Sequence, residues 1–325
     1  MPILILRVIQ TISIIFLTTT LAFAGGWEEI QQKAANGDLA SQKELAGIWY
    51  TSVTSKNDEK AFKWYAAAAE QGDLESLFMK GYMLFQGEGV TKDYASALDI
   101  FRILEKESYS DAMAMLGFMY ERGLGVEQSA SNMLAYYTKG ARLNNLNSIK
   151  NLAVLYAAGE LVEQNLAKSF QLHKKAADLG DPESCASVTR MYYLGEGVQK
   201  NIKQAALYSV KGAEGGDATA MEMAATLYYN GQGVAQNHQE ALKWFQLAAE
   251  NKNLYAQYMV GKMYAYGEGA EKNLYTADLW LAIASYCGHK DAETLLTNVR
   301  SEADKTGVMT MRSAQPLKLH CACCQ

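Results

Sequence analysis

The sequence predicts an all-α solenoid, in which repeated pairs of helices stack and each repeat packs only on its neighbours. Three observations lead to this prediction. Glycines recur at a constant spacing of 36 residues, apolar residues with helical periodicity precede them, and Asp, Asn or Ser stands six residues after each glycine. The glycines are Gly87, Gly123, Gly159, Gly195, Gly231 and Gly267.

The first element in chain order is residues 1–24, which are typical of a secretory signal peptide cleaved after Ala24. One charge, Arg7, precedes an apolar run from Val8 to Leu17, and the small-residue triplet Ala22-Phe23-Ala24 follows. An uncleaved membrane anchor is the alternative, but polar residues interrupt the roughly 20 apolar residues that a span needs. We therefore expect a periplasmic or secreted protein with no stable membrane insertion after cleavage.

Each repeat is predicted to consist of a helix A, a glycine turn and a helix B. The glycine permits a positive φ and ends helix A with a left-handed cap. The Asp, Asn or Ser six residues later accepts a backbone N–H and starts helix B. A second glycine stands two residues after the first in five repeats, and Leu161 replaces it in the other. Apolar residues four positions before the first glycine are predicted to face the core: Met83, Met119, Leu155, Met191, Leu227 and Met263.

The ends of the array are predicted to differ from its middle. Residues 25–37 match only the second half of a repeat and are expected to form an N-terminal cap helix. Seven repeats occupy residues 38–289, the first with one residue deleted in its loop. Residues 290–305 are expected to form a C-terminal cap helix that covers the last apolar face, and residues 306–325 a disordered tail.

The five cysteines are distributed unevenly. Cys185 and Cys287 lie in different repeats and are not expected to pair, so helix packing alone is expected to hold the fold. The other three, Cys321, Cys323 and Cys324, stand at the chain end, where they could bind a soft metal or form mixed disulfides. We favour an incidental tail sequence and expect no metal site, because nothing upstream supplies a partner loop.

The repeat pattern resembles that of the Sel1-like repeat family of TPR-like proteins, in its exported bacterial type. It is complete in Leu116-Gly117-x-x-Tyr120-x-x-Gly123-Leu124-Gly125-Val126. Tetratricopeptide repeats have a period of 34 residues and lack the double glycine. The resemblance implies a right-handed superhelix whose concave face is lined by helix A. It also implies an adaptor or scaffold that binds a protein or peptide there, in envelope signalling, complex assembly or contact with a host cell.

Tyrosine and arginine on a rigid exposed face suit protein binding, because they offer large contact area with few rotamers to restrict. The candidate binding residues lie on or beside a stripe of helix A that no packing rule requires. The alternative is that such tyrosines pack against the next repeat. The candidates are Tyr82, Phe118, Arg190, Tyr193, Tyr229, Tyr258, Lys262 and Tyr266.

Composition and motifs argue against several other functions. The formal net charge of −5 offers no general attraction for nucleic acid. No phosphate-binding loop or His-Glu-x-x-His helix is present, and the Gly-x-Gly pairs follow helices instead of strands, so no cofactor is expected. Cysteine-rich members of the resembled family have been linked with penicillin binding and weak β-lactam hydrolysis. A related cell-wall enzyme is therefore the alternative function, but Ser-x-x-Lys is absent and we expect no catalytic residues.

Overall fold

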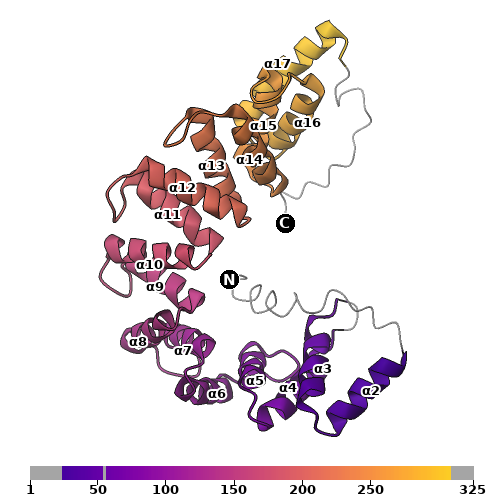
Figure 1. Ribbon diagram of the computed structural model, residues 1–325, viewed down its shortest axis with the longest axis vertical. Coiled ribbons are helices and arrows are strands. Elements are labelled where there is room, and N and C mark those ends of the chain that lie inside the picture. The colour runs from indigo at the N-terminus through magenta and orange to yellow at the C-terminus, as the bar shows by residue number, and fades with distance from the viewer. Residues whose placement is uncertain (1–23, 54–55, 309–325) are drawn as a thin grey trace. The chain divides into compact units, whose positions relative to one another are not determined.

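The computed structural model describes residues 24–53 and 56–308 of the 325-residue chain. These residues form 16 helices and no strand, so the predicted all-α class is confirmed. Residues 1–23 of the predicted signal peptide and the three C-terminal cysteines lie outside the described residues. The helices, drawn in chain order in Figure 1, are α2 (Ala24–Ala35), α3 (Leu39–Thr51), α4 (Asp58–Glu70), α5 (Leu74–Gln86), α6 (Tyr94–Lys106), α7 (Ser110–Arg122), α8 (Ala130–Arg142), α9 (Leu146–Ala158), α10 (Leu166–Asp178), α11 (Pro182–Leu194), α12 (Ile202–Glu214), α13 (Ala218–Asn230), α14 (His238–Glu250), α15 (Leu254–Tyr266), α16 (Leu274–Tyr286) and α17 (Lys290–Thr306).

The helices group into two compact units, each described here by itself. Unit 1 ends at Leu152 and unit 2 begins at Ala153, so the boundary falls within α9. Odd-numbered helices from α3 to α15 are the A helices of the repeats, and even-numbered helices from α4 to α16 are the B helices. Within each unit a helix packs on the next one along the chain, as α7 does on α8 and α15 on α16. In unit 2, α11 also contacts α13, the A helix of the next repeat.

The first glycine of the turn has the predicted left-handed conformation in all six repeats that carry it. Gly195, with φ of 82°, ends α11, and its N–H donates to the carbonyl of Met191 at 2.8 Å. The predicted helix starts are also confirmed. For example, Asn201 Oδ1 accepts a hydrogen bond from the Gln204 N–H, which would otherwise lack a partner in the first turn of α12.

The second glycine of the turn is where one repeat approaches the preceding repeat most closely. A Cβ atom built on Gly197 would lie 2.1 Å from the carbonyl oxygen of Leu166, the first residue of α10. Ordinary contacts of a Cβ atom are at least 3.4 Å. The same clash recurs with the preceding helix B at Gly89, Gly125, Gly233 and Gly269. The double glycine is therefore both a helix cap and an inter-repeat contact.

The core lies between the A and B helices of each unit. Five of the residues predicted to face it are at most 3% exposed: Met83, Met119, Met191, Leu227 and Met263. Phe101 is fully buried in unit 1 and Phe245 in unit 2. After the last repeat, α17 buries Leu295, Leu296 and Val299 together with residues of α16, so it covers the apolar end of unit 2.

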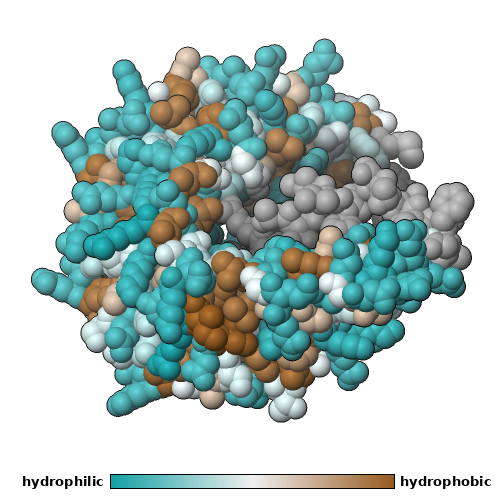
Figure 2. Space-filling model, turned by 60° about the horizontal axis from the view of Figure 1, so that its bottom comes forward, coloured by the Kyte–Doolittle hydropathy of each residue, from teal (hydrophilic) through white to brown (hydrophobic). Residues whose placement is uncertain are grey.

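On the face in Figure 2, hydrophilic side chains cover most of the surface and hydrophobic ones gather in small patches. None of the helices in the described residues is long and apolar enough to cross a membrane.

One expectation about the cysteines is wrong. Cys185 is a free buried thiol and does not pair with Cys287, as predicted, but Cys287 is disulfide-bonded, whereas helix packing without any disulfide was expected.

Candidate protein-binding surface

Two of the predicted binding residues lie in unit 1, and the structure buries one of them. Tyr82 of α5 is 8% exposed, stacks on Phe78 and accepts a hydrogen bond from Gln86 Nε2 at 2.8 Å. Phe118 of α7 is half-buried and meets the ring of Phe85 edge-on, with ring centroids 6.1 Å apart. Tyr82 is thus part of the core of unit 1 and has little area to offer a partner.

The other six predicted residues lie in unit 2, and two of them belong to α11. Arg190 is exposed, and its guanidinium donates to Glu196 Oε2 at 2.6 Å. Tyr193 is half-buried and donates from its hydroxyl to Gln232 Oε1 at 3.3 Å. Because Gln232 belongs to the next repeat, Tyr193 connects neighbouring repeats. Tyr229 makes the equivalent bond to Glu268 at 2.8 Å.

The structure brings the remaining predicted residues together. We define the tyrosine surface as Tyr229 of α13 with Tyr255, Tyr258, Lys262 and Tyr266 of α15. The Lys262 ammonium lies 5.6 Å from the centre of the Tyr229 ring, and the rings of Tyr255 and Tyr258 are 6.4 Å apart. Tyr266 is 60% exposed and Tyr255 is 39% exposed. These two rings therefore offer the most contact area to a partner.

Two histidines stack on tyrosines of this surface, and the sequence patterns predicted neither contact. His238, the first residue of α14, stacks on Tyr229 with ring centroids 5.0 Å apart. His289, which precedes α17, stacks on Tyr258 at 4.4 Å. Each histidine lies at the start of another helix than the one that carries its tyrosine, so the helical period does not mark the pair. The stacking restricts the tyrosine rings, which lowers the entropy that binding would cost.

Each of three tyrosines on the surface has an acidic neighbour. Burial, followed by the hydrogen bond to Glu268, raises the pKa of Tyr229 to about 12. Burial and then the nearby Glu222 raise the pKa of Tyr255. Burial, with Asp291 as the next cause, raises the pKa of Tyr258. At neutral pH these phenols therefore stay protonated, and the rings lie among carboxylates with Lys262 as a neighbouring cation.

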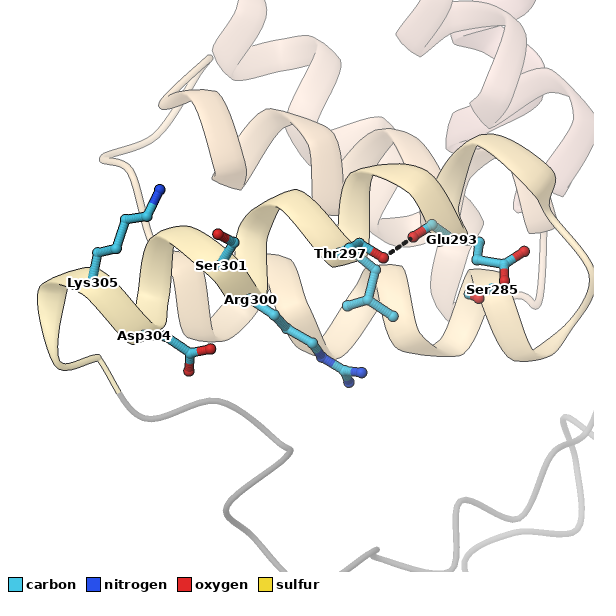
Figure 3. Close-up of a pocket in the computed structure, with 8 residues that line it drawn as sticks. Ser285, Glu293, Thr297, Arg300, Ser301, Asp304 and Lys305 are labelled. Carbon is cyan, nitrogen blue, oxygen red and sulfur yellow. Dashed lines mark hydrogen bonds between the residues drawn. The ribbon is translucent and has the colours of Figure 1, made fainter.

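An open pocket of about 650 Å³ lies on α16 and α17, away from the predicted binding residues (Figure 3). Its Arg300 pairs with Asp278, a fully buried carboxylate of α16, and Thr297 donates to the backbone carbonyl of Glu293 at 3.1 Å. Among the residues that line the pocket there is no histidine or cysteine. In the described ranges, no three His, Cys, Asp or Glu residues are arranged to hold a metal ion.

Comparison with known families gives seven matches along the chain. The family described as Sel1 repeat matches residues 40–73, 74–103, 110–145, 147–181, 183–217, 218–253 and 254–289. Together these matches extend from residue 40 to residue 289 and cover more than half of the chain.

Solved structures show the same solenoid fold. The chain is similar to a protective antigen present in uropathogenic Escherichia coli strains, which displays an SLR fold, with 28% sequence identity and a TM-score of 0.72. The match covers 84% of this chain but 58% of the antigen, so the chain spans less than two thirds of that protein. A Sel1 repeat protein from Oxalobacter formigenes has 26% identity and a TM-score of 0.64, with 83% of this chain and 78% of that chain covered.

Proposed function

Because the chain belongs to the Sel1 repeat family, we propose that it is an exported scaffold that holds a protein or peptide on the helix A face of its repeats. Sel1 repeat proteins are generally protein-interaction scaffolds and typically non-enzymatic. The observation that carries the proposal is the tyrosine surface. It combines two exposed rings, two rings fixed by histidines and one cation on neighbouring A helices.

Two observations support export. The N-terminal sequence is typical of a cleaved signal peptide, and Cys287 is disulfide-bonded. Disulfides form and persist in oxidising compartments outside the cytosol. The similar protein from uropathogenic Escherichia coli is described as a protective antigen, which is consistent with a role in the envelope or in contact with a host. We place the mature chain, from residue 25 onward, in the periplasm or outside the cell.

The electrostatics of the tyrosine surface indicate the partner's chemistry. Glu222, Glu268 and Asp291 adjoin its rings, whereas Lys262 is the cation that lies over one of them. A peptide segment with lysine or arginine beside an apolar residue would suit this arrangement. Its cation can stack on a tyrosine face and interact with a carboxylate, and its apolar side chain can cover the exposed rings.

The chain provides a matched control for a binding experiment. Tyr255→Ala with Tyr266→Ala removes the two exposed rings of the tyrosine surface. Tyr275→Ala with Tyr286→Ala removes two rings of α16, a B helix, that are 46% and 74% exposed. Both double variants replace two exposed tyrosines of the same repeat by alanine. They differ mainly in whether the lost rings lie on the A helix or on the B helix.

The parent and both variants would be used to capture proteins from envelope and host-cell extracts. The captured partner would then be purified and its Kd measured by calorimetry. We expect the Tyr255/Tyr266 variant to lose at least about 30-fold in affinity, because central aromatic residues each contribute about 2 kcal/mol or more. The Tyr275/Tyr286 variant should bind like the parent. Equal affinities for all three proteins would refute the proposed face.

A further inference from the structure

Helix α16, near the C-terminal end of unit 2 (Figure 1), has an apolar outer side. Tyr286 is 74% exposed and Tyr275 is 46% exposed. Leu279 and Ile283 are half-buried and lie outside the core cluster that α16 forms with α17. The four residues follow the spacing i, i+4, i+8 and i+11, so they lie within about 80° of one another around the helix axis. We call them the α16 stripe.

The other B helices provide an internal comparison, because their corresponding residues precede the α16 stripe by multiples of 36. Lysine occupies the position of Leu279 in α4 and α14, and the position of Ile283 in α8, α10 and α12. The position of Tyr286 holds a charged residue in all six. Within α16 the only charged residue is Asp278, which is buried and paired with Arg300. An uncharged outer stripe is therefore specific to the last repeat, and the packing of a repeat does not require it.

We propose that the α16 stripe is a self-association surface, on which a second copy of the chain packs its own α16 in antiparallel orientation about a two-fold axis. The stripe is nearly symmetric about the middle of the helix. An antiparallel pair therefore places Tyr275 beside the second copy's Tyr286, and Leu279 beside the second copy's Ile283. Every residue of the stripe then meets an apolar or aromatic one, as a contact between two identical surfaces requires.

The charges at the two ends of α16 fit the same arrangement. Glu271 precedes the helix and Lys290 follows it, and both are exposed without an ion pair to any described residue. The adjacent Lys272 is already paired with Glu302 at 2.6 Å. In the antiparallel pair, the end with Glu271 meets the end with the second copy's Lys290, once on each side of the axis. A parallel pair would bring like charges together, so the charges favour the antiparallel orientation.

The contact is small, so we expect a weak dimer. The 13-residue helix α16 is about 20 Å long at 1.5 Å per residue. A pair of such helices buries less than the roughly 1,600 Å² of a standard interface, which corresponds to a dissociation constant of about 10–100 µM. The self-association does not depend on the proposed function, because the α16 stripe lies on a B helix and the tyrosine surface on A helices.

Sedimentation equilibrium of the mature chain, residues 25–325, tests the proposal. The average mass should rise from that of one chain toward that of two as the concentration passes the dissociation constant. Leu279→Lys with Ile283→Lys should weaken association at least about tenfold, because each copy would bury two ammonium groups in the contact. Other B helices carry lysine at these positions, so the variant should keep the parent's circular dichroism and urea midpoint. Ile103→Lys is the matched control: Ile103 is 50% exposed at the position of Ile283 in α6, and its variant should dimerise like the parent.

Exchange of charges tests the orientation. At low salt, Glu271→Lys should weaken association at least about threefold, and the addition of Lys290→Glu should restore it. The Tyr275→Ala/Tyr286→Ala variant should lose self-association and still bind a helix A partner with the parent's affinity per chain. Failure of this proposal and failure of the proposed function are therefore distinguishable.

Several results would overturn the proposal. A parent chain that stays monomeric well above the expected dissociation constant would do so, as would equal association of the parent and the Leu279/Ile283 variant. A dimer that survives a non-reducing denaturing gel would be covalent. A dimer that forms only after deletion of residues 309–325 would show that this segment covers the stripe. Stripe-dependent binding to phosphatidylglycerol vesicles by a monomeric chain would assign the stripe to a membrane, and loss of association that Lys290→Glu does not restore would exclude the antiparallel pair.

Discussion

Replacing Gly197 by alanine is expected to separate two repeats that the parent chain holds in contact. The added Cβ would lie 2.1 Å from the carbonyl oxygen of Leu166 and 2.3 Å from its carbonyl carbon. Both atoms belong to the backbone of the preceding repeat and cannot rotate away. Relief of the clash requires a shift of α10 relative to the turn by roughly 1 Å, since ordinary contacts of this kind begin at 3.4 Å.

The cost has two parts. Alanine at a φ of 69° costs about 1–2 kcal/mol relative to glycine. Overpacking against a fixed backbone adds about 1–3 kcal/mol. Gly195, two residues earlier, is the matched control. Its φ is 82°, but an added Cβ would meet Lys200 Cβ at 3.4 Å, which is an ordinary contact. Gly195→Ala should therefore cost only the first part, about 1–2 kcal/mol.

Urea unfolding of residues 25–325, followed by circular dichroism at 222 nm, measures the difference. With a slope of about 2 kcal/mol per M, the midpoint of Gly197→Ala should lie about 0.5–1.5 M below that of Gly195→Ala. Hydrogen exchange should locate the additional opening at α10 and at the turn after α11. Equal midpoints and equal exchange in the two variants would show that Gly197 serves only to permit a positive φ in the turn, which would refute the reasoning.

Three further predictions concern charges and caps. The pKa of Tyr229 is raised to about 12 in the folded chain, so as the pH rises the unfolded chain loses the phenol proton before the folded chain does. The contribution of Tyr229 to stability is therefore present below pH 10 and lost between pH 10 and about 12. Tyr229→Phe should reduce the fall in urea midpoint between pH 9 and 11. Arg300→Leu removes the cation that pairs with the fully buried Asp278 and should lower the free energy of unfolding in urea by about 3–5 kcal/mol. Adding Asp278→Leu should recover much of this loss. Asn201→Ala removes the hydrogen-bond acceptor at the start of α12 and should lower the free energy of unfolding by about 1 kcal/mol in the same measurement. A loss below about 0.3 kcal/mol would show that the cap is dispensable.

The local features of the fold were predictable because their physics is local. The cap at Gly195 and the helix start at Asn201 depend on residues within one turn, so a repeated spacing reveals them. Burial of Met191 and Met263 follows from the helical period.

Features that join distant residues were not predictable in the same way. The approach of Gly197 to Leu166 and the stacking of His289 on Tyr258 each involve separate elements. No periodicity places such pairs in contact, because they depend on how one repeat lies on the next. For the same reason, the sequence indicated a stripe on helix A but not that Tyr82 within it is buried.

The contact at the second glycine also bears on how such a chain can lengthen during evolution. A duplicated segment of one complete period places a new glycine against the start of a B helix, as Gly233 lies against Ile202. In the repeats that carry the second glycine, a segment of another length would bring a side chain against that backbone, where a Cβ atom already clashes. Duplication of whole periods is therefore the tolerated route. The proposed binding surface can then be extended one repeat at a time, while the existing contacts between repeats stay unchanged.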